Sequence, residues 1–171
     1  MRRFIRIPKI PDILDVLCDD REKRPLSLPS DHFRMTRKRL RTGDYTFRGL
    51  ESIVAIERKN GLAEIVTDLS YKVRPRFVAM LHRLSRFPVR LMIVEGDGPR
   101  DTFNIIDYRT GESVSTVRTV MYWLSAISVK YRVPVIFTGP LTPHGFIGQI
   151  FEDAYQAGIA WQNGGKDEKE V

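Results

Sequence analysis

The feature of the sequence that most constrains the fold is a short apolar run that turns charged at its end. Residues 53–56 are apolar and rich in β-branched side chains, and Glu57, Arg58 and Lys59 follow directly. β-Branched residues favour extended backbone, so the run predicts a buried strand with a polar end. Because the side chains of a strand point to alternate faces, Glu57 and Lys59 should lie on one face and Arg58 on the other.

A carboxylate and an ammonium group side by side at a strand end suit metal-assisted phosphodiester hydrolysis. Asp44 lies earlier in the chain, in a Gly-Asp-Tyr turn that leads into another predicted strand. Carboxylates such as Asp44 and Glu57 offer hard oxygen ligands to a divalent cation, and Lys59 could steady an attacking water or the developing charge on phosphate. Taken alone, Glu57, Arg58 and Lys59 are more commonly a solvated strand end with a surface ion pair.

The order of the predicted elements indicates an α/β fold. Strands are predicted over residues 13–18, 32–40, 45–48, 53–59, 89–94 and 134–138, and helices over 62–69, 74–87, 113–131 and 142–157. Ser113 and Thr142 are the expected N-caps of the last two helices. Strands come first and helices and strands then alternate, which predicts an α/β/α sandwich whose mixed central sheet is an antiparallel meander feeding right-handed crossovers. Active sites on such sheets gather at strand ends, where Asp19, Asp44 and Glu57 can converge.

The length suits one domain. Residues 1–12 are interpreted as a basic N-terminal arm, residues 13–158 as the domain and residues 159–171 as a flexible polar tail. The charged loop that follows residue 18 is either a surface loop or the rim of an active site, and residues 96–112 are expected to form an exposed loop.

The charge of the chain favours a polyanionic partner. Lys and Arg number 28 against 21 Asp and Glu, which gives a net charge of +7. Nucleic acid is the expected partner, because no strongly amphipathic basic helix suggests a membrane surface and no apolar run approaches the roughly 18 residues of a membrane-spanning helix. Cys18 is the only cysteine, which excludes a disulfide framework and indicates a reducing, cytoplasmic setting, near the nucleoid if the protein is cellular.

Five segments of the sequence resemble the XPF-type structure-specific endonuclease family, which includes the archaeal protein Hef. They are Asp19-Asp20-Arg21-Glu22, Gly43-Asp44-Tyr45, the signature Glu57-Arg58-Lys59, residues 92–96 and residues 133–138. Each segment alone is a weak signal, but five in the family order with sensible spacing are a strong one. The resemblance extends over about residues 13–157, which is nearly the whole chain.

The resemblance implies a restriction-endonuclease-like fold and a phosphodiesterase that uses Mg²⁺ or Mn²⁺ on branched DNA. It implies that Asp44 and Glu57 are metal ligands, and that Asp19 and Glu22 are further acidic groups in or near the metal site. Lys59 would orient the nucleophilic water or stabilise the transition state. The candidate DNA-contacting residues are Arg21, Arg58, Arg74, Arg76 and Arg83. For the last three a solvated helix face is the alternative, and Arg58 is expected to hold either structure or substrate.

One departure from the family pattern concerns an acid beyond the signature. The pattern places an Asp four residues after the lysine, and this chain has Ala63 there. Glu64 follows immediately, and a one-residue slip over residues 60–62 would let Glu64 serve instead. The slip also aligns the apolar residues of the next helix with the family helix, so we favour it. Without the slip the site has lost one acid.

A second departure concerns the binding of duplex DNA. Family members usually carry a tandem helix-hairpin-helix module after the nuclease domain, and the short tail here cannot replace it. We expect the grip to come from the arginines, from a second subunit or from a helper protein. Family nuclease domains commonly dimerise, so we expect a homodimer through the helices at 113–131 and 142–157, although core packing would also explain their apolar stripes.

Three functions remain open at this point. The leading hypothesis is a metal-dependent DNA endonuclease that cuts near branches, flaps or forks. The alternative is a non-catalytic DNA-binding subunit that positions an active partner. A third is a basic protein–protein or ribonucleoprotein adaptor. Degenerate family members usually lose the Glu-Arg-Lys triplet and this chain keeps it, which favours the enzyme.

Overall fold

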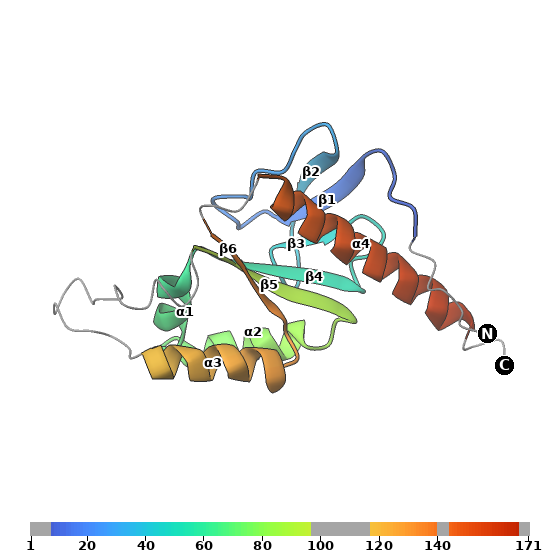
Figure 1. Cartoon of the computed structure of the whole chain (residues 1–171). Coiled ribbons are helices and arrows are strands. Elements are labelled where there is room, and N and C mark those ends of the chain that lie inside the picture. The colour runs from blue at the N-terminus through green and yellow to red at the C-terminus, as the bar shows by residue number, and fades with distance from the viewer. Residues whose placement is uncertain (1–7, 97–116, 140–143, 168–171) are drawn as a thin grey trace. The chain divides into compact units, whose positions relative to one another are not determined.

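The computed structural model describes residues 8–96, 117–139 and 144–167, in which four strands come first and helices and strands follow (Figure 1). In chain order the elements are β1 (Leu14–Asp19), β2 (Phe33–Lys38), β3 (Tyr45–Phe47), β4 (Val54–Lys59), α1 (Leu62–Asp68), α2 (Arg74–Leu84), β5 (Val89–Glu95), α3 (Val117–Val129), β6 (Val135–Thr138) and α4 (His144–Asp167). The six strands form one mixed sheet in the order β2-β1-β3-β4-β5-β6. The predicted α/β fold with a mixed central sheet is therefore confirmed.

The N-terminal part of the sheet differs from the predicted antiparallel meander. Strand β2 lies at the sheet edge and pairs with β1 in parallel, whereas β3 pairs with the other side of β1 in antiparallel fashion. A parallel neighbour needs a connection of a dozen or more residues. Residues 20–32, with Pro25 and Pro29, provide that connection.

Helix α4 is longer than the sequence predicted. It continues to Asp167, so residues 159–167 are helical where a flexible tail was expected. Half-buried Ile159 and exposed Trp161 extend the apolar spacing of the helix, and Ala160 is a strong helix former. The expected N-caps Ser113 and Thr142 lie outside the described residues, as does nearly all of the loop predicted over 96–112.

The chain divides into two compact units, and the single domain expected from the sequence stays a prediction. The first contains residues 1–55, 87–89 and 143–171, and the second contains residues 56–86 and 90–142.

The first unit packs α4 against one face of strands β1, β2 and β3. The ring of Phe151 in α4 makes edge-to-face contacts with Phe33, Tyr45 and Phe47, at centroid distances of 6.3, 5.4 and 6.1 Å. These rings come from alternate strand positions, so they share one face of the sheet. Burying them removes a large apolar area from water, which makes this the hydrophobic core of the unit.

The second unit is built from α1, α2, β5, α3, β6 and most of β4. Strands β5 and β6 pair in parallel, with Glu95 opposite Thr138. Helical spacing predicts an apolar stripe of Phe77, Met80, Leu81 and Leu84 on α2, and the structure buries all of these except the half-buried Met80. In α3, by contrast, helical spacing predicts that Met121 is buried beside Val120 and Leu124, and Met121 is 43% exposed.

None of the helices among the described residues has the length and apolar character that a membrane crossing requires.

Candidate active site

The charged end of β4 is buried, and its side chains alternate as predicted. Glu57 and Lys59 are only 8% and 7% exposed. The Lys59 Nζ lies 3.2 Å from the Glu57 Oε1, so the two side chains share one face of the strand. The alternative of a solvated strand end is wrong for this pair, because charged side chains almost never lose this much solvent unless they are paired.

Two further carboxylates meet the same ammonium group. The Lys59 Nζ lies 3.2 Å from the Glu64 Oε1 and 2.8 Å from the Asp68 Oδ2. Glu64 and Asp68 are four residues apart on α1, which places them on one helix face. Lys59 also lies over the ring of Phe77, 5.5 Å from its centroid. We call Lys59 with Glu57, Glu64 and Asp68 the Lys59 cluster.

The Lys59 cluster keeps its lysine charged. Burial alone would lower the pKa of Lys59, but the charge of Glu57 and the hydrogen bond and charge of Asp68 outweigh burial, with a further contribution from Glu64. The pKa of Lys59 is therefore raised above its ordinary value. At neutral pH this side chain is an ammonium ion that can donate hydrogen bonds but cannot act as a general base.

The structure brings Glu64 to the signature lysine and leaves Ala63 exposed. Gly61 precedes α1 with a φ of 90°, which an L side chain rarely adopts, and this turn starts the helix directly after the strand. The Glu64 Oε2 then accepts a hydrogen bond from the Asn60 backbone N–H at 2.8 Å. The geometry agrees with the one-residue slip, and the replacement of the family Asp by Glu64 stays a prediction.

Asp68 is the member of the Lys59 cluster that sequence reasoning missed. It makes the shortest of the three contacts to the Lys59 Nζ and comes from the last position of α1. The signal was present on the polar face of the helix, because an acid four residues after Glu64 must share its face.

Arg58 points to the other face of β4, as predicted, and binds a carboxylate of β5. Its Nε and Nη2 atoms donate to Glu95 Oε1 and Oε2 at 2.8 and 2.9 Å. This bidentate geometry is the strongest that an arginine makes with a carboxylate. The Arg58 side chain is only 8% exposed. Of the two roles expected for Arg58, the contacts support a structural one.

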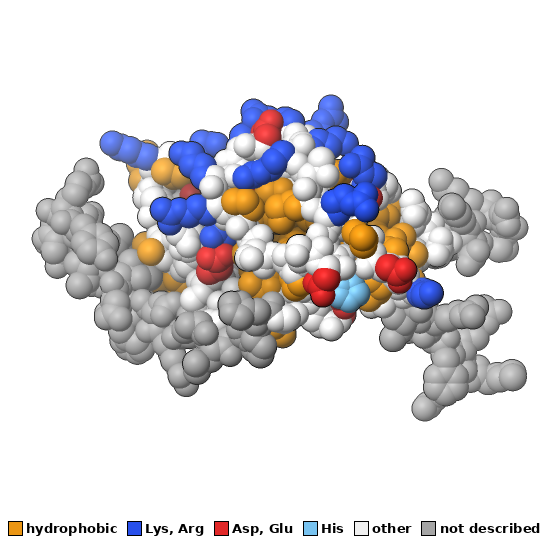
Figure 2. Space-filling model, turned by 90° about the horizontal axis from the view of Figure 1, so that it is seen from above, with side chains coloured by type: hydrophobic (Ala, Val, Ile, Leu, Met, Phe, Trp, Pro, Cys, Tyr) orange, Lys and Arg blue, Asp and Glu red, His pale blue; other side chains and the backbone are white. Residues whose placement is uncertain are grey.

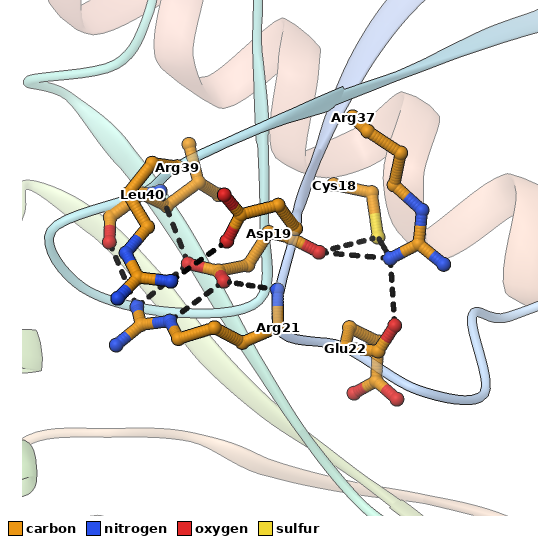
Figure 3. A network of polar contacts seen from close by, with 8 residues as sticks. Cys18, Asp19, Arg21, Glu22, Arg37, Arg39 and Leu40 are labelled. Carbon is orange, nitrogen blue, oxygen red and sulfur yellow. Dashed lines mark hydrogen bonds and ion pairs between the residues drawn. The ribbon is translucent and has the colours of Figure 1, made fainter.

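The second charged cluster lies in the first unit, in the loop that follows β1 (Figure 3). Asp19 is buried, and its Oδ1 accepts hydrogen bonds from the backbone N–H and the Nε of Arg21, both at 2.8 Å. Its Oδ2 accepts from Arg21 Nη2 at 2.7 Å and from the Leu40 backbone N–H at 3.0 Å. The Arg21 hydrogen bonds outweigh the effect of burial and hold the pKa of Asp19 well below its usual range.

Arg37 fixes the other side of this loop. Its Nη1 donates to the backbone oxygens of Asp19 and Glu22 at 2.8 and 2.7 Å and lies 3.4 Å from the Cys18 Sγ (Figure 3). Burial raises the pKa of the Cys18 thiol, Arg37 opposes that rise, and the charges of Glu22 and Asp44 add to it. The half-buried Asp44 therefore lies close enough to act electrostatically on this loop, and its backbone oxygen accepts the Asp19 N–H at 2.7 Å.

The donor chemistry around these clusters bears on the expected metal. Within residues 8–96, 117–139 and 144–167, no three His, Cys, Asp or Glu side chains are grouped so that they could hold a metal ion. Mg²⁺ commonly binds one or two carboxylates and takes its other ligands from water and phosphate. Glu57 and Asp44 are carboxylates, which is the type of ligand that Mg²⁺ requires. Asp19 already uses both oxygens on Arg21 and Leu40.

The candidate DNA-contacting arginines of α2 differ in their surroundings. Arg76 and Arg83 are exposed. The Arg74 Nε donates to the Leu69 backbone oxygen at 2.9 Å, and its guanidinium lies 5.7 Å from the centroid of the Trp123 ring. Arg76 and Arg83 therefore present their charge to solvent, whereas Arg74 also links α2 to its neighbours.

Comparison with known proteins identifies the family. The family model described as the ERCC4 domain matches residues 18–141, which is more than half of the chain and includes both charged clusters. The chain belongs to the ERCC4 domain family. The predicted resemblance to XPF-type nucleases is thereby confirmed, while the roles of its individual residues stay predictions.

Solved structures show the same fold as this ERCC4-domain chain. XPF from Aeropyrum pernix matches with a TM-score of 0.57 and 20% identity, covering 82% of this chain and 62% of that one. XPF from the same organism in complex with DNA matches with a TM-score of 0.59 and 21% identity, covering 84% of this chain and 66% of that one. This chain thus spans less than two thirds of either protein, and the likeness at this identity is one of fold. No curated protein sequence matches it.

Proposed function

We propose that this ERCC4-domain chain is a divalent-metal-dependent DNA endonuclease that hydrolyses phosphodiester bonds near branches, flaps or forks. The observation that carries the proposal is the buried Glu57–Lys59 pair at the family signature, with Glu64 and Asp68 beside it. Apolar residues of similar volume would serve stability as well as a buried ion pair does. Buried charges whose pKa values are strongly perturbed are, in contrast, typical of catalytic sites.

Lys59 is proposed to stabilise the charge that develops on the phosphate. Carboxylate oxygens of Glu57, Glu64 and Asp68 lie within 3.2 Å of its Nζ, so the ammonium group is positioned before the reaction begins. Glu64 and Asp68 act through Lys59 and are therefore positioning residues. Their charge keeps the Lys59 Nζ protonated, which is the state that can donate to a phosphate oxygen.

Asp44 and Glu57 are proposed to hold Mg²⁺ or Mn²⁺. When bound, such an ion lowers the pKa of its water and neutralises phosphate charge. Glu57 would contribute a carboxylate oxygen to the ion from its place beside Lys59. The contacts of Asp19 instead support a role in shaping the loop of residues 19–24, through which Arg21 and Glu22 are placed.

A homodimer through α3 and α4 is proposed as the working assembly. Both helices expose large apolar side chains, which are Met121, Tyr122, Val129, Phe146 and Trp161. Exposed apolar surface commonly marks protein–protein contacts, which supports the proposal. A second subunit could also supply part of the grip on duplex DNA, and a helper protein remains the other proposed source.

The test is a cleavage assay with the full chain. End-labelled forked, flapped and plain duplex DNA of matched sequence would be incubated with Mg²⁺, Mn²⁺ or EDTA. We expect cuts near the branch in either metal, none in EDTA, and loss of cutting in Asp44→Asn with DNA binding retained. Asp153→Asn, which makes the same change at an exposed position of α4, should cut like the parent.

Three results would redirect the proposal. Binding without cutting by the parent protein in both metals would favour the non-catalytic subunit. Cutting by Asp44→Asn at the parental rate would remove Asp44 from the metal site. Binding that ignores both metal and branching would favour the adaptor.

A further inference from the structure

The face of strands β1 to β3 that lies opposite α4 carries a row of cations. The rings that α4 covers, Phe33 and Phe47 among them, occupy alternate positions of these strands. The intervening positions therefore point to the other face. The cations there are Arg34 and Lys38 of β2 and Arg48, which directly follows β3. We call Arg34, Lys38 and Arg48 the basic face.

Two of these cations share a single acid. Arg34 lies opposite Asp15 in the register of β1 and β2. On the other side of β1, the Arg48 backbone N–H donates to the Asp15 backbone oxygen at 3.0 Å. The Arg34 Nη1 lies 3.5 Å from Asp15 Oδ1 and the Arg48 Nε lies 3.8 Å from Asp15 Oδ2. Both separations exceed those of good hydrogen bonds. The row therefore keeps a net positive charge, and its two guanidinium groups are held only loosely.

The guanidinium groups are also open to solvent. The side chains of Arg34 and Arg48 are 64% and 58% exposed. Lys38 pairs with Glu51 at 3.2 Å, and both of these side chains are exposed as well. Surface ion pairs of this kind contribute little free energy, so the cations can exchange these acids for another anion.

The surrounding sequence is also basic. Over residues 32–48 the charged residues are Arg34, Arg37, Lys38, Arg39, Arg41 and Arg48 against the single acid Asp44. Figure 2 shows Lys and Arg side chains gathered along one side of the molecular face in view, with few acidic side chains between them.

We propose that the basic face binds the sugar–phosphate backbone of duplex DNA without regard to sequence. Neighbouring strands lie about 4.8 Å apart, so a row across three strands spans roughly 10 Å. Each DNA strand carries one phosphate per roughly 3.4 Å of helix axis, so a row of that length meets several phosphates. The inference rests on the proposed function, in which DNA is the substrate, and it adds a contact surface that is separate from the signature residues.

Edge protection is the competing explanation. Strand β2 is an edge strand, and charged side chains on edge strands prevent pairing with other copies of a chain. That explanation predicts self-association when the charges are removed and no effect on DNA binding.

The experiment measures equilibrium binding of a fluorescent plain duplex in EDTA, from low to moderate salt, so that cleavage does not interfere. Arg34→Ala/Arg48→Ala is compared with Arg86→Ala/Lys130→Ala, which removes the same charge from residues of the second unit. Arg34→Lys/Arg48→Lys keeps the charge and tests whether charge alone is needed. Circular dichroism and light scattering report folding and self-association.

We expect Arg34→Ala/Arg48→Ala to bind about tenfold more weakly. The dependence of log K on log salt should become shallower by about 1.8, which is about 0.9 for each of two lost phosphate contacts. The lysine variant should keep the parental slope, and the Arg86/Lys130 variant should match the parent. An unchanged slope in Arg34→Ala/Arg48→Ala, an equal loss in the control, or self-association without a binding defect would overturn the inference. Failure of the inference alone would leave metal-dependent cutting intact, whereas failure of the proposed function would remove cutting or DNA binding from the parent protein itself.

Discussion

At the scale of single residues, Lys59 carries one positive charge and is surrounded by three carboxylates. Three carboxylates lie within 3.2 Å of its Nζ, and at most one of them is neutralised by it. The remaining charge makes this a place where a further cation or a rearrangement of protons would be stabilising. Such a surplus is unfavourable for folding alone and is expected where binding or catalysis uses it.

Asp68→Asn tests the positioning role of Asp68. The change keeps the shape of the side chain and removes its charge, so the pKa of Lys59 should fall towards its ordinary value. Single-turnover cleavage of a forked DNA should slow several-fold at saturating enzyme, and DNA binding should stay unchanged. Asp68→Glu should restore part of the rate. A parental rate in Asp68→Asn would show that Asp68 has no role in the reaction.

Asp19→Asn tests the loop that follows β1. Because the pKa of Asp19 is depressed by folding, its carboxylate stabilises the folded state at pH values above 3.8, its ordinary pKa. This stabilisation is lost as the pH falls below 3.8. Asp19→Asn should therefore lower the free energy of unfolding by about 2 kcal/mol at pH 7, with the difference from the parent narrowing below about pH 4. Urea unfolding of both proteins at pH 7 and below about pH 4 measures this difference in the free energy of unfolding.

The neighbouring Asp20 provides the matched control for Asp19. It is exposed and pairs with the exposed Arg39 at 2.9 Å. Asp20→Asn should change the free energy of unfolding by less than about 0.5 kcal/mol at either pH. Equal effects of the two substitutions would contradict the structural role of Asp19.

The charged residues of the candidate site show which contacts a sequence can and cannot predict. The strand period was enough to place Glu57 and Lys59 together, because alternation is a property of the local backbone. The partners of Asp19 could not be predicted, since Leu40 reaches it only through the fold of the intervening chain. Arg58 was assigned to a face correctly, but Glu95 became its partner only once β4 and β5 were placed.

At the scale of elements, the packing of α4 depends on how closely the helix approaches the strands. A Cβ built on Gly158 would lie 2.6 Å from Val54 Cγ2 and 3.0 Å from Leu50 Cδ1. Real Cβ atoms do not approach other atoms this closely, so glycine is required at this crossing.

Gly158→Ala should consequently destabilise the protein. Overpacking costs about 1–3 kcal/mol, and the better helix propensity of alanine returns at most about 1 kcal/mol. Gly164→Ala is the control, because a Cβ there meets no atom within 4 Å and the change should be neutral or stabilising. Chemical denaturation of both variants measures the difference. If Gly158→Ala proved as stable as Gly164→Ala, the close approach of α4 to Leu50 and Val54 would be contradicted.

The elements also show where periodicity is informative. The stripe of α2 was predicted because Phe77, Met80, Leu81 and Leu84 recur at helical spacing, and all but the half-buried Met80 are buried. Met121 fits the stripe of α3 equally well by spacing and is exposed, since burial depends on which neighbours the helix meets. The parallel pairing of β1 and β2 was missed for a similar reason, because a loop of this length permits either direction.

At the scale of the whole molecule, the proposed homodimer makes a prediction about mass in solution. Light scattering coupled to size exclusion should give a dimer for the parent, and Tyr122→Arg or Trp161→Arg should shift it to a monomer. Both side chains are large, apolar and exposed, at 67% and 59%. Tyr71, which is 89% exposed outside α3 and α4, supplies the control Tyr71→Arg, which should remain dimeric. A monomeric parent at micromolar concentration would remove this interface.

The most direct test of the account is single-turnover cleavage of a forked DNA by Glu57→Gln, with binding of the same DNA measured in parallel. Glutamine preserves the size of the side chain and removes the charge that faces both Lys59 and the proposed metal. Glu152→Gln, a half-buried residue of α4, is the matched control.

We predict that Glu57→Gln binds the fork as the parent does and loses cutting by at least about a hundredfold in Mg²⁺, which corresponds to roughly 2.7 kcal/mol of transition-state stabilisation. Glu152→Gln should cut normally. If Glu57→Gln cuts at the parental rate while remaining folded, the buried Glu57–Lys59 pair is structural and the proposed active site is wrong.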